Sequence, residues 1–414
     1  MDHRIKLRGA RAEKILMALP NEEKGHVHYI DALRGLAFFL VFWFHASKSI
    51  ENLPNLLGDI LGRGFSGVQL FFVVSALTLF NSMTNRTKND AAPLRAYFIR
   101  RLCRVAPMFW CAIVLYAVVL GFGPRWGAPN GLETHDIAVA SLFLHGFDPD
   151  ALNSVVPGGW SVAVEMQFYL LLPLIFAWAR TLKRAVLLFV LSLVIAIAAS
   201  PAIKGLGAWL LPSEPPGLMS QFAYFSLPTQ LPVFFCGIIL GLLMGAERAK
   251  LRRIEACLPA GPRSRAAIAV ALAVLICLPM RWTGRVEMIA GIPGHIGYGV
   301  AYALLVYALA TFPFKGLVNP FFCYAGKISY SGYLLHIFVI DKAQEFLLGF
   351  PQFEALSPQV RLALLGFPAL GVTMLLATIT YWCVERPGVE RGRRFIRKLF
   401  GPSLAAPARV AAVA

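Results

Sequence analysis

The sequence predicts an all-α protein, a polytopic membrane bundle of about ten transmembrane helices with both termini in the cytoplasm. Of its 414 residues, 57% are apolar and only 15% are charged, whereas about a quarter of a soluble domain is charged. The mean hydropathy is +0.64, and long apolar runs recur from residue 30 onward. These observations exclude a soluble enzyme, a secreted disulfide scaffold and a disordered protein.

The apolar runs give the expected spans. A helix needs about 20 apolar residues to cross a bilayer, with roughly 17 as the lower limit. The ten expected spans are 30–48, 65–83, 105–122, 159–179, 185–200, 228–246, 266–280, 294–312, 319–340 and 361–383. The fifth and seventh are the shortest. The run 137–146 is too short to cross and is expected to be re-entrant or interfacial.

The charges alternate with the spans. The chain has 39 Lys and Arg against 22 Asp and Glu, a net charge of +17. With the N-terminus inside, 31 of the basic residues fall in expected cytoplasmic segments and 8 in outer segments, as the positive-inside rule requires. This asymmetry accounts for the net charge, so the expected partner is a lipid bilayer and not nucleic acid.

The chain divides into three expected parts. Residues 1–28 form a basic cytoplasmic segment without a cleavable signal peptide, residues 29–387 form the membrane domain, and residues 388–414 form a cytoplasmic tail. No internal repeat is visible. The seven cysteines are scattered and have no metal-ligand spacing, so no metal site is expected.

Ionisable groups inside the spans mark candidate functional sites, because each is costly in lipid unless it is paired or faces a cavity. Arg34 and His45 are 11 residues apart in the first span. At about 100° and 1.5 Å per residue they share one helix face, roughly 16 Å apart along the axis. Two simpler interpretations stay open: Arg34 extends to the lipid headgroups, and His45 is a hydrogen-bonded core residue.

The fourth span carries a polar stripe. It opens at Trp160, and Ser161, Glu165 and Tyr169 follow on one face at i, i+4 and i+8. This span runs inward, so Glu165 is expected at a depth similar to that of His45. A carboxylate beside an imidazole can orient a general base, although such a pair can also serve helix packing alone.

Two further groups carry polar side chains. Ser329 and His336 lie on the ninth span, where hydroxyl groups often bind neighbouring helices and nothing more. Arg100 and Arg104 lie one turn apart at a cytoplasmic helix start. They fit either an anchor that stops translocation or a pair that binds phosphates arriving from the cytoplasm.

Taken in order, these residues resemble the acyltransferase-3 family, the multi-span membrane O-acyltransferases of bacterial lipopolysaccharide and exopolysaccharide. The resemblance covers most of the chain, from about Tyr29 to Pro387. It rests on Asp31-Ala-Leu-Arg34-Gly-Leu-Ala with His45, Phe71-Phe-Val-Val-Ser75, Arg100-Arg101-Leu-Cys-Arg104-Val-Ala-Pro107, Trp160-Ser161-Val-Ala-Val-Glu165 with Gln167-Phe-Tyr169-Leu, Ile328-Ser-Tyr-Ser-Gly-Tyr333-Leu-Leu-His336 and Glu385-Arg-Pro387. One departure is Ala76-Leu77-Thr78, where the family usually has Ser-Gly-Phe.

The resemblance implies an acyl-CoA donor, most simply acetyl-CoA, used as a co-substrate without any permanently bound cofactor. It implies a glycan or glycolipid hydroxyl as the acceptor and a bacterial inner membrane as the location. By position, His45 matches the essential histidine, Arg34 its partner on the first helix, and Glu165 the acidic residue of the Trp-Ser motif. Arg100 and Arg104 match the arginine pair associated with the CoA phosphates.

The expected reaction is acyl transfer to a sugar hydroxyl, with His45 as the base and Glu165 as its partner. Arg34, or the Ser and Tyr side chains of the stripes, would stabilise the oxyanion. The alternatives are a proton-coupled transporter or flippase of a glycan or lipid precursor, which should show repeat symmetry, and a purely structural subunit. Direct transfer and relay through an acylated residue both stay open.

Overall fold

A computed structural model describes residues 28–86, 93–125, 127–210, 216–259, 261–280, 288–289 and 292–401. The expected N-terminal segment, apart from its last residue, and the end of the expected tail lie outside these residues.

The helices and strands of the described residues comprise a set of helices and one small hairpin, in which two-residue strands pair antiparallel, with Met288 opposite Pro293. The elements are α2 (His28–Lys48), α3 (Asn55–Gly62), η1 (Arg63–Ser66), α4 (Gly67–Arg86), α5 (Pro93–Leu120), α6 (Thr134–Ser141), η2 (His145–Phe147), α7 (Trp160–Trp178), α8 (Leu182–Leu210), α9 (Pro216–Phe225), α10 (Leu227–Met244), α11 (Arg248–Ala256), α12 (Pro262–Cys277), β1 (Met288–Ile289), β2 (Ile292–Pro293), α13 (Gly294–Thr311), α14 (Pro320–Lys327), α15 (Ser329–Leu348), α16 (Pro351–Glu354), α17 (Pro358–Thr380), η3 (Tyr381–Glu385) and α18 (Arg386–Phe400).

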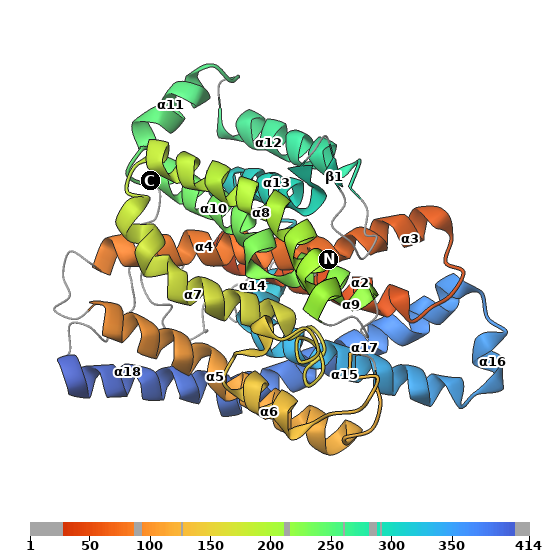
Figure 1. Ribbon diagram of the computed structural model, residues 1–414. Helices are drawn as coiled ribbons and strands as arrows, with labels where there is room; N and C mark the ends of the chain where they lie inside the picture. Colours follow the sequence, from red (N-terminus) through yellow and green to blue (C-terminus); the bar gives the residue numbers. More distant parts are fainter. Residues whose placement is uncertain are drawn as a thin grey trace, which may run out of the picture.

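The long helices lie side by side and form one bundle (Figure 1). Within the described residues, eight helices are long and apolar enough to cross a membrane, which makes the chain a multi-pass membrane protein. Helices α2, α4 and α10 are largely buried in its interior, whereas only 17% of the apolar stretch of α8 is buried. The large apolar side chains that α8 exposes, such as Leu187, Leu191 and Val194, are those expected to face lipid tails.

The structure has eight such helices where the sequence predicted ten spans. Two expected spans, 266–280 and 319–340, have no matching helix that is both long and apolar enough, and each has an identifiable reason. The span expected at 266–280 corresponds to α12, which has only 16 residues. The span expected at 319–340 is split at Ile328 into α14 and α15. The last third of α15 carries Asp341, Lys342 and Glu345, and three charges within one span are too costly for a lipid-facing helix.

Small residues hold α2 against α14. A Cβ added at Gly35 would collide with the carbonyl oxygen of Phe322, and one added at Gly326 would collide with that of Asp31. The two backbones therefore touch, as is common where membrane helices pack through glycine. This contact fixes the start of α2, and with it the direction in which Arg34 and His45 project.

The connection before α7 enters the protein. Residues 151–160 are all buried, and α7 begins only at Trp160, at the end of this segment. The expected short segment 137–146 is in fact the two-turn helix α6 followed by the single turn η2. Helix α7 therefore begins inside the protein, behind a buried segment, and not at an exposed surface.

Helices α17 and α18 form one rod of 43 residues, Pro358–Phe400, interrupted by a wide π-helical turn at η3. Gly388 and Gly392 of α18 pack directly on Cys103 and Pro107 of α5. Residues 388–401, expected to be part of a tail, are thus largely a packed helix.

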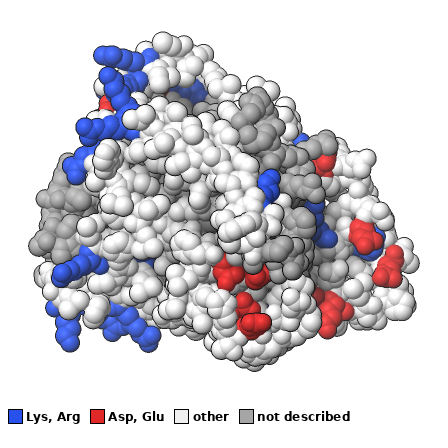
Figure 2. Space-filling view, viewed as in Figure 1, with Lys and Arg blue, Asp and Glu red and all other residues white. Residues whose placement is uncertain are grey.

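Charged side chains separate to the two ends of the bundle. Figure 2 shows Lys and Arg gathered at the end that holds α11 and α18, and most Asp and Glu of this face at the opposite end, around α3, α6 and α16. This is the distribution that the positive-inside rule favours for a membrane protein. The cytoplasmic location of the termini stays a prediction.

Candidate functional site

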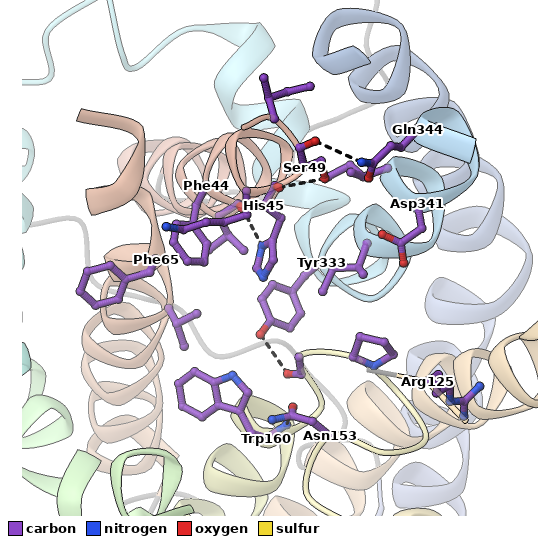
Figure 3. Close-up of a pocket in the computed structure, with 18 of the residues that line it drawn as sticks. Phe44, His45, Ser49, Phe65, Arg125, Asn153, Trp160, Tyr333, Asp341 and Gln344 are labelled. Carbon is purple, nitrogen blue, oxygen red and sulfur yellow. Dashed lines mark hydrogen bonds between the residues drawn. The ribbon is translucent and has the colours of Figure 1, made fainter. Parts of the chain in front are cut away.

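A cavity of about 750 Å³ opens among α2, α15 and the buried segment before α7. Its size lies within the range of about 300–1,000 Å³ that is usual for ligand sites. His45 projects from α2 into it, opposite Tyr333 and Trp160 (Figure 3). We call it the large cavity. It is lined by Val41, Phe44, His45, Lys48, Ser49, Ile50, Glu51, Phe65, Val68, Gln69, Leu120, Arg125, Asn153, Pro157, Gly158, Trp160, Tyr224, Phe225, Tyr333, Ile337, Ile340, Asp341, Gln344, Leu348, Phe353, Glu354 and Arg361.

Hydrogen bonds fix the tautomer of His45. Its Nδ1 lies 2.9 Å from the carbonyl oxygen of Val41 and 3.2 Å from Nε2 of His336. His336 Nδ1 lies 2.6 Å from the carbonyl oxygen of Tyr333. A carbonyl oxygen only accepts, so both Nδ1 atoms carry protons, and His336 Nε2 accepts from His45. The remaining nitrogen of His45, Nε2, is left as an unprotonated acceptor.

The expected pair between His45 and Glu165 does not form. Ser75 of α4 donates a 2.6 Å hydrogen bond to Glu165 Oε1, and Glu165 lines a second, smaller pocket that does not include His45. The carboxylate and the imidazole line different pockets, because α7 presents Glu165 to Ser75 of α4. The imidazole of His336, expected only as supporting polar lining, takes the partner position instead.

The second pocket has a volume of about 100 Å³. Three guanidinium groups converge on it, so we call it the arginine pocket. It is lined by Arg34, Val68, Phe71, Phe72, Ser75, Thr78, Arg101, Arg104, Val105, Ser161, Val162, Glu165, Tyr169, Ser329, Tyr330 and Tyr333. Arg34 therefore lies in a different compartment from His45, although both project from α2 into the interior.

The arginine that joins Arg104 in this pocket is Arg101, not the expected Arg100, which is absent from the lining. Arg101 lies over the ring of Tyr169, 5.9 Å from the ring centre. Among the described residues its Nε–H has no hydrogen-bond partner although it is buried. Sequence spacing did not separate the two arginines, because i, i+3 and i, i+4 pairs both share a helix face.

Arg104 is held by a buried carboxylate. Its Nη1 forms an ion pair with Oε1 of Glu385, a residue that is 1% exposed. Ser331 donates a 2.9 Å hydrogen bond to the other carboxylate oxygen. The Glu385-Arg-Pro387 motif thus ties the end of α17 to α5 and α15, whereas Arg386 forms a separate, exposed pair with Glu390.

The remaining expected lining residues divide between the two compartments. Trp160 lines the large cavity, whereas Ser161, Tyr169 and Ser329 line the arginine pocket. Ser329 donates a 2.8 Å hydrogen bond to the carbonyl oxygen of Gly326, which joins the start of α15 to the end of α14.

Arg125 closes one side of the large cavity. Its guanidinium donates to backbone carbonyl oxygens on both sides of the loop, among them those of Tyr116 at 3.3 Å and Ser154 at 3.1 Å. Burial lowers the pKa of Arg125, but an arginine keeps its proton in proteins. This cation therefore joins the loop after α5 to the buried segment before α7.

In the part of the chain that the structure describes, no group of three or more His, Cys, Asp or Glu side chains could hold a metal ion.

A helical membrane bundle that encloses a paired imidazole and a cluster of arginines defines a multi-pass membrane protein with an internal polar site. The chain belongs to the acyltransferase-3 family, because the acyltransferase domain of that family matches residues 27–382. This confirms the resemblance drawn from the sequence motifs.

The chain is similar to several bacterial proteins named as O-acetyltransferases or putative O-acetyltransferases. The peptidoglycan O-acetyltransferase OatA of Listeria monocytogenes is 26% identical over 394 residues, covering 89% of this chain and 56% of that protein. The putative peptidoglycan O-acetyltransferase YrhL of Bacillus subtilis is 26% identical over 91% of this chain and 57% of its own length. A putative O-acetyltransferase of Staphylococcus aureus (strain COL) is 24% identical over 90% and 60%. This chain thus spans less than two thirds of these relatives. No solved structure matches it.

Proposed function

We propose that the protein is an O-acetyltransferase of the bacterial inner membrane, which moves an acetyl group from acetyl-CoA to a hydroxyl of an exported or cell-surface glycan. The observation that carries this proposal is the imidazole of His45. It projects into a ligand-sized cavity, and its Nδ1 proton is engaged by Val41 and His336. His45 Nε2 is then the acceptor that a general base requires.

The reaction balances with this one base. His45 Nε2 takes the proton of the acceptor hydroxyl as its oxygen attacks the carbonyl carbon of the thioester. The new C–O bond of the acetate ester forms, the C–S bond breaks, and the proton passes from His45 to the CoA thiolate. The developing imidazolium is stabilised by the hydrogen bonds that its Nδ1–H donates to Val41 and His336.

The donor fits the arginine pocket. CoA is a polyanion, and the three arginines Arg34, Arg101 and Arg104 outnumber the two carboxylates beside them, Glu165 in the lining and Glu385 paired with Arg104. The buried, unpartnered Nε–H of Arg101 supports an anionic ligand, since a buried donor without a partner is costly. A pocket of about 100 Å³ holds one stretch of a long thin ligand and not a whole nucleotide.

The acceptor fits the large cavity. Its wall combines aromatic groups, such as Trp160 and Phe225, with amides, such as Asn153 and Gln69, which suit the apolar faces and hydroxyls of a sugar. Peptidoglycan is named for two of the relatives and is the first acceptor to test. Lipopolysaccharide and exopolysaccharide, which the sequence motifs favoured, are the next.

The test uses purified protein in nanodiscs with acetyl-labelled acetyl-CoA and, in turn, peptidoglycan fragments and lipopolysaccharide. Base-labile label on one of these glycans is expected for the wild type, and a loss of about 10²-fold or more is expected for His45→Ala, as for removal of a general base. His135→Ala is the matched control, because His135 is an exposed histidine paired with Asp148 outside the cavity.

A His45→Ala protein that acetylates its glycan at the wild-type rate would refute the assigned base. Wild-type protein that transfers no acetyl group, but moves a glycan or lipid precursor across a proteoliposome membrane in response to a pH gradient, would favour the transporter instead.

A further inference from the structure

The large cavity and the arginine pocket share one wall. Among the described residues, only Val68 of α4 and Tyr333 of α15 line both. Between the two side chains, Tyr333 is the one that polar contacts hold in place. If the donor lies on one side of this wall and the base on the other, the thioester has to pass Tyr333 to be attacked.

The Tyr333 hydroxyl is held by the beginning of α7. It accepts a 2.8 Å hydrogen bond from Ser161 Oγ and donates a 3.0 Å hydrogen bond to the carbonyl oxygen of Gly158. Figure 3 shows its ring directed from α15 toward Trp160 and Asn153, with His45 beside it. The ring also meets Phe71 edge to face, with centres 6.1 Å apart.

Gly158 is suited to this contact. Its φ of +79° lies in the left-handed region that favours glycine, and a Cβ added there would lie 3.2 Å from the Tyr333 hydroxyl oxygen. The turn therefore presents a carbonyl oxygen to Tyr333 at a distance that a larger residue would disturb.

We propose that Tyr333 is a movable partition between the donor and acceptor compartments, closed by its hydrogen bonds to Ser161 and Gly158. This inference rests on the proposed acetyl transfer. When the ring turns aside, the acetyl thioester reaches His45; when it is closed, water in the large cavity is kept from the thioester. Tyr333 is thus a positioning residue that decides whether the acetyl group goes to a glycan or to water.

The hydrogen bonds set the size of the expected effect. A typical hydrogen bond contributes about 1 kcal/mol net, and every 1.4 kcal/mol is a factor of ten in an equilibrium. Tyr333→Phe removes both bonds and keeps the ring, so the open fraction should rise about 25-fold. Ser161→Ala removes one bond, leaves Tyr333 intact and should give a smaller rise, of about fivefold.

The experiment measures two rates in nanodiscs: release of CoA from acetyl-CoA without acceptor, and acetyl transfer to the glycan that the wild type accepts. Tyr333→Phe is expected to raise acceptor-independent CoA release about 25-fold while it still transfers acetyl groups. Tyr333→Trp, with a larger ring, is expected to slow transfer at least tenfold while its Kd for acetyl-CoA stays within about twofold. Tyr324→Phe is the control, since its exposed hydroxyl binds Thr378 away from both compartments.

The outcomes separate this inference from the proposed function. A wild-type protein that transfers no acetyl group contradicts the proposed function itself. An active wild type with unchanged CoA release in both Tyr333→Phe and Ser161→Ala, at an unchanged Kd, overturns the partition. An acetyl group found on Tyr333 by mass spectrometry, with transfer abolished in Tyr333→Phe, also overturns it and assigns the hydroxyl a covalent relay.

Discussion

His336 Nε2 lies 3.2 Å from His45 Nδ1, and this contact between α15 and α2 determines which nitrogen of His45 can act as a base. His336 is 1% exposed and has its own Nδ1 proton engaged by the carbonyl oxygen of Tyr333. It can therefore accept the His45 proton but has none to give through Nε2.

His336→Ala should lower kcat about tenfold and leave the Kd for acetyl-CoA unchanged, because the imidazole of His45 loses an orienting acceptor. His336→Gln should recover part of the rate, since its amide oxygen can accept the same proton. The measurement is a steady-state rate in nanodiscs, with donor binding measured separately. Equal rates for His336→Ala and the wild type would remove His336 from the mechanism.

Arg101→Ala should raise the Kd for acetyl-CoA about tenfold, since a hydrogen bond to a charged group contributes about 1.5–3 kcal/mol. Arg100→Ala should change it less than twofold, because Arg100 does not line the arginine pocket. Isothermal titration of the two neighbouring variants makes each a control for the other. A larger increase in Kd for Arg100→Ala than for Arg101→Ala would instead support Arg100 and Arg104 as the donor-binding pair.

Glu385→Ala should destabilise the protein by about 3–5 kcal/mol, because it leaves the partly buried Arg104 cation without its carboxylate. Glu390→Ala, which breaks an exposed pair with Arg386, should cost less than about 1 kcal/mol. The thermal unfolding temperatures of the two variants in one detergent give the comparison. Similar unfolding temperatures for the two variants would show that the buried ion pair contributes no more to stability than the exposed one.

Gly326→Ala should destabilise the bundle by about 1–3 kcal/mol or prevent its assembly, since the added methyl group meets the backbone of Asp31 on α2. Gly371→Ala is the matched control on α17, where an added Cβ has no neighbour within 4 Å. Alanine is the better helix former, so this control should be neutral or slightly more stable. Thermal unfolding and yield after gel filtration report both.

The sequence predicted the membrane bundle and the family, because apolar runs and ordered motifs are local properties of the chain. It also predicted that Arg34 and His45 share one face of one helix, and the structure has both side chains lining internal pockets. Two expected spans fell short for reasons that hydropathy alone does not weigh, the short α12 and the charged end of α15.

The pairing of site residues could not be predicted, because it depends on depth. Glu165 was assigned to the level of His45 by assuming that α7 begins at the membrane surface, whereas the buried segment 151–160 starts it inside the bundle. His336 was recognised as polar lining, but its contact with His45 depends on how α15 is rotated against α2. The choice of Arg101 over Arg100 is likewise a matter of helix rotation.

The π-helical turn Tyr381–Glu385 sets the rotational phase between the two halves of the 43-residue rod. The buried side of α17 runs down to Ala377, and in an unbroken α-helix Glu385, eight residues later, would lie about 80° away from that side. The extra residue held in the wide turn cancels this offset. Deleting one residue from this turn would rotate α18 by about 100°. The Glu385 carboxylate and the two glycines, Gly388 and Gly392, would then all lose their contacts with α5. The winding of this single turn thus determines both the position of the buried Glu385 carboxylate and the packing of α18 on α5.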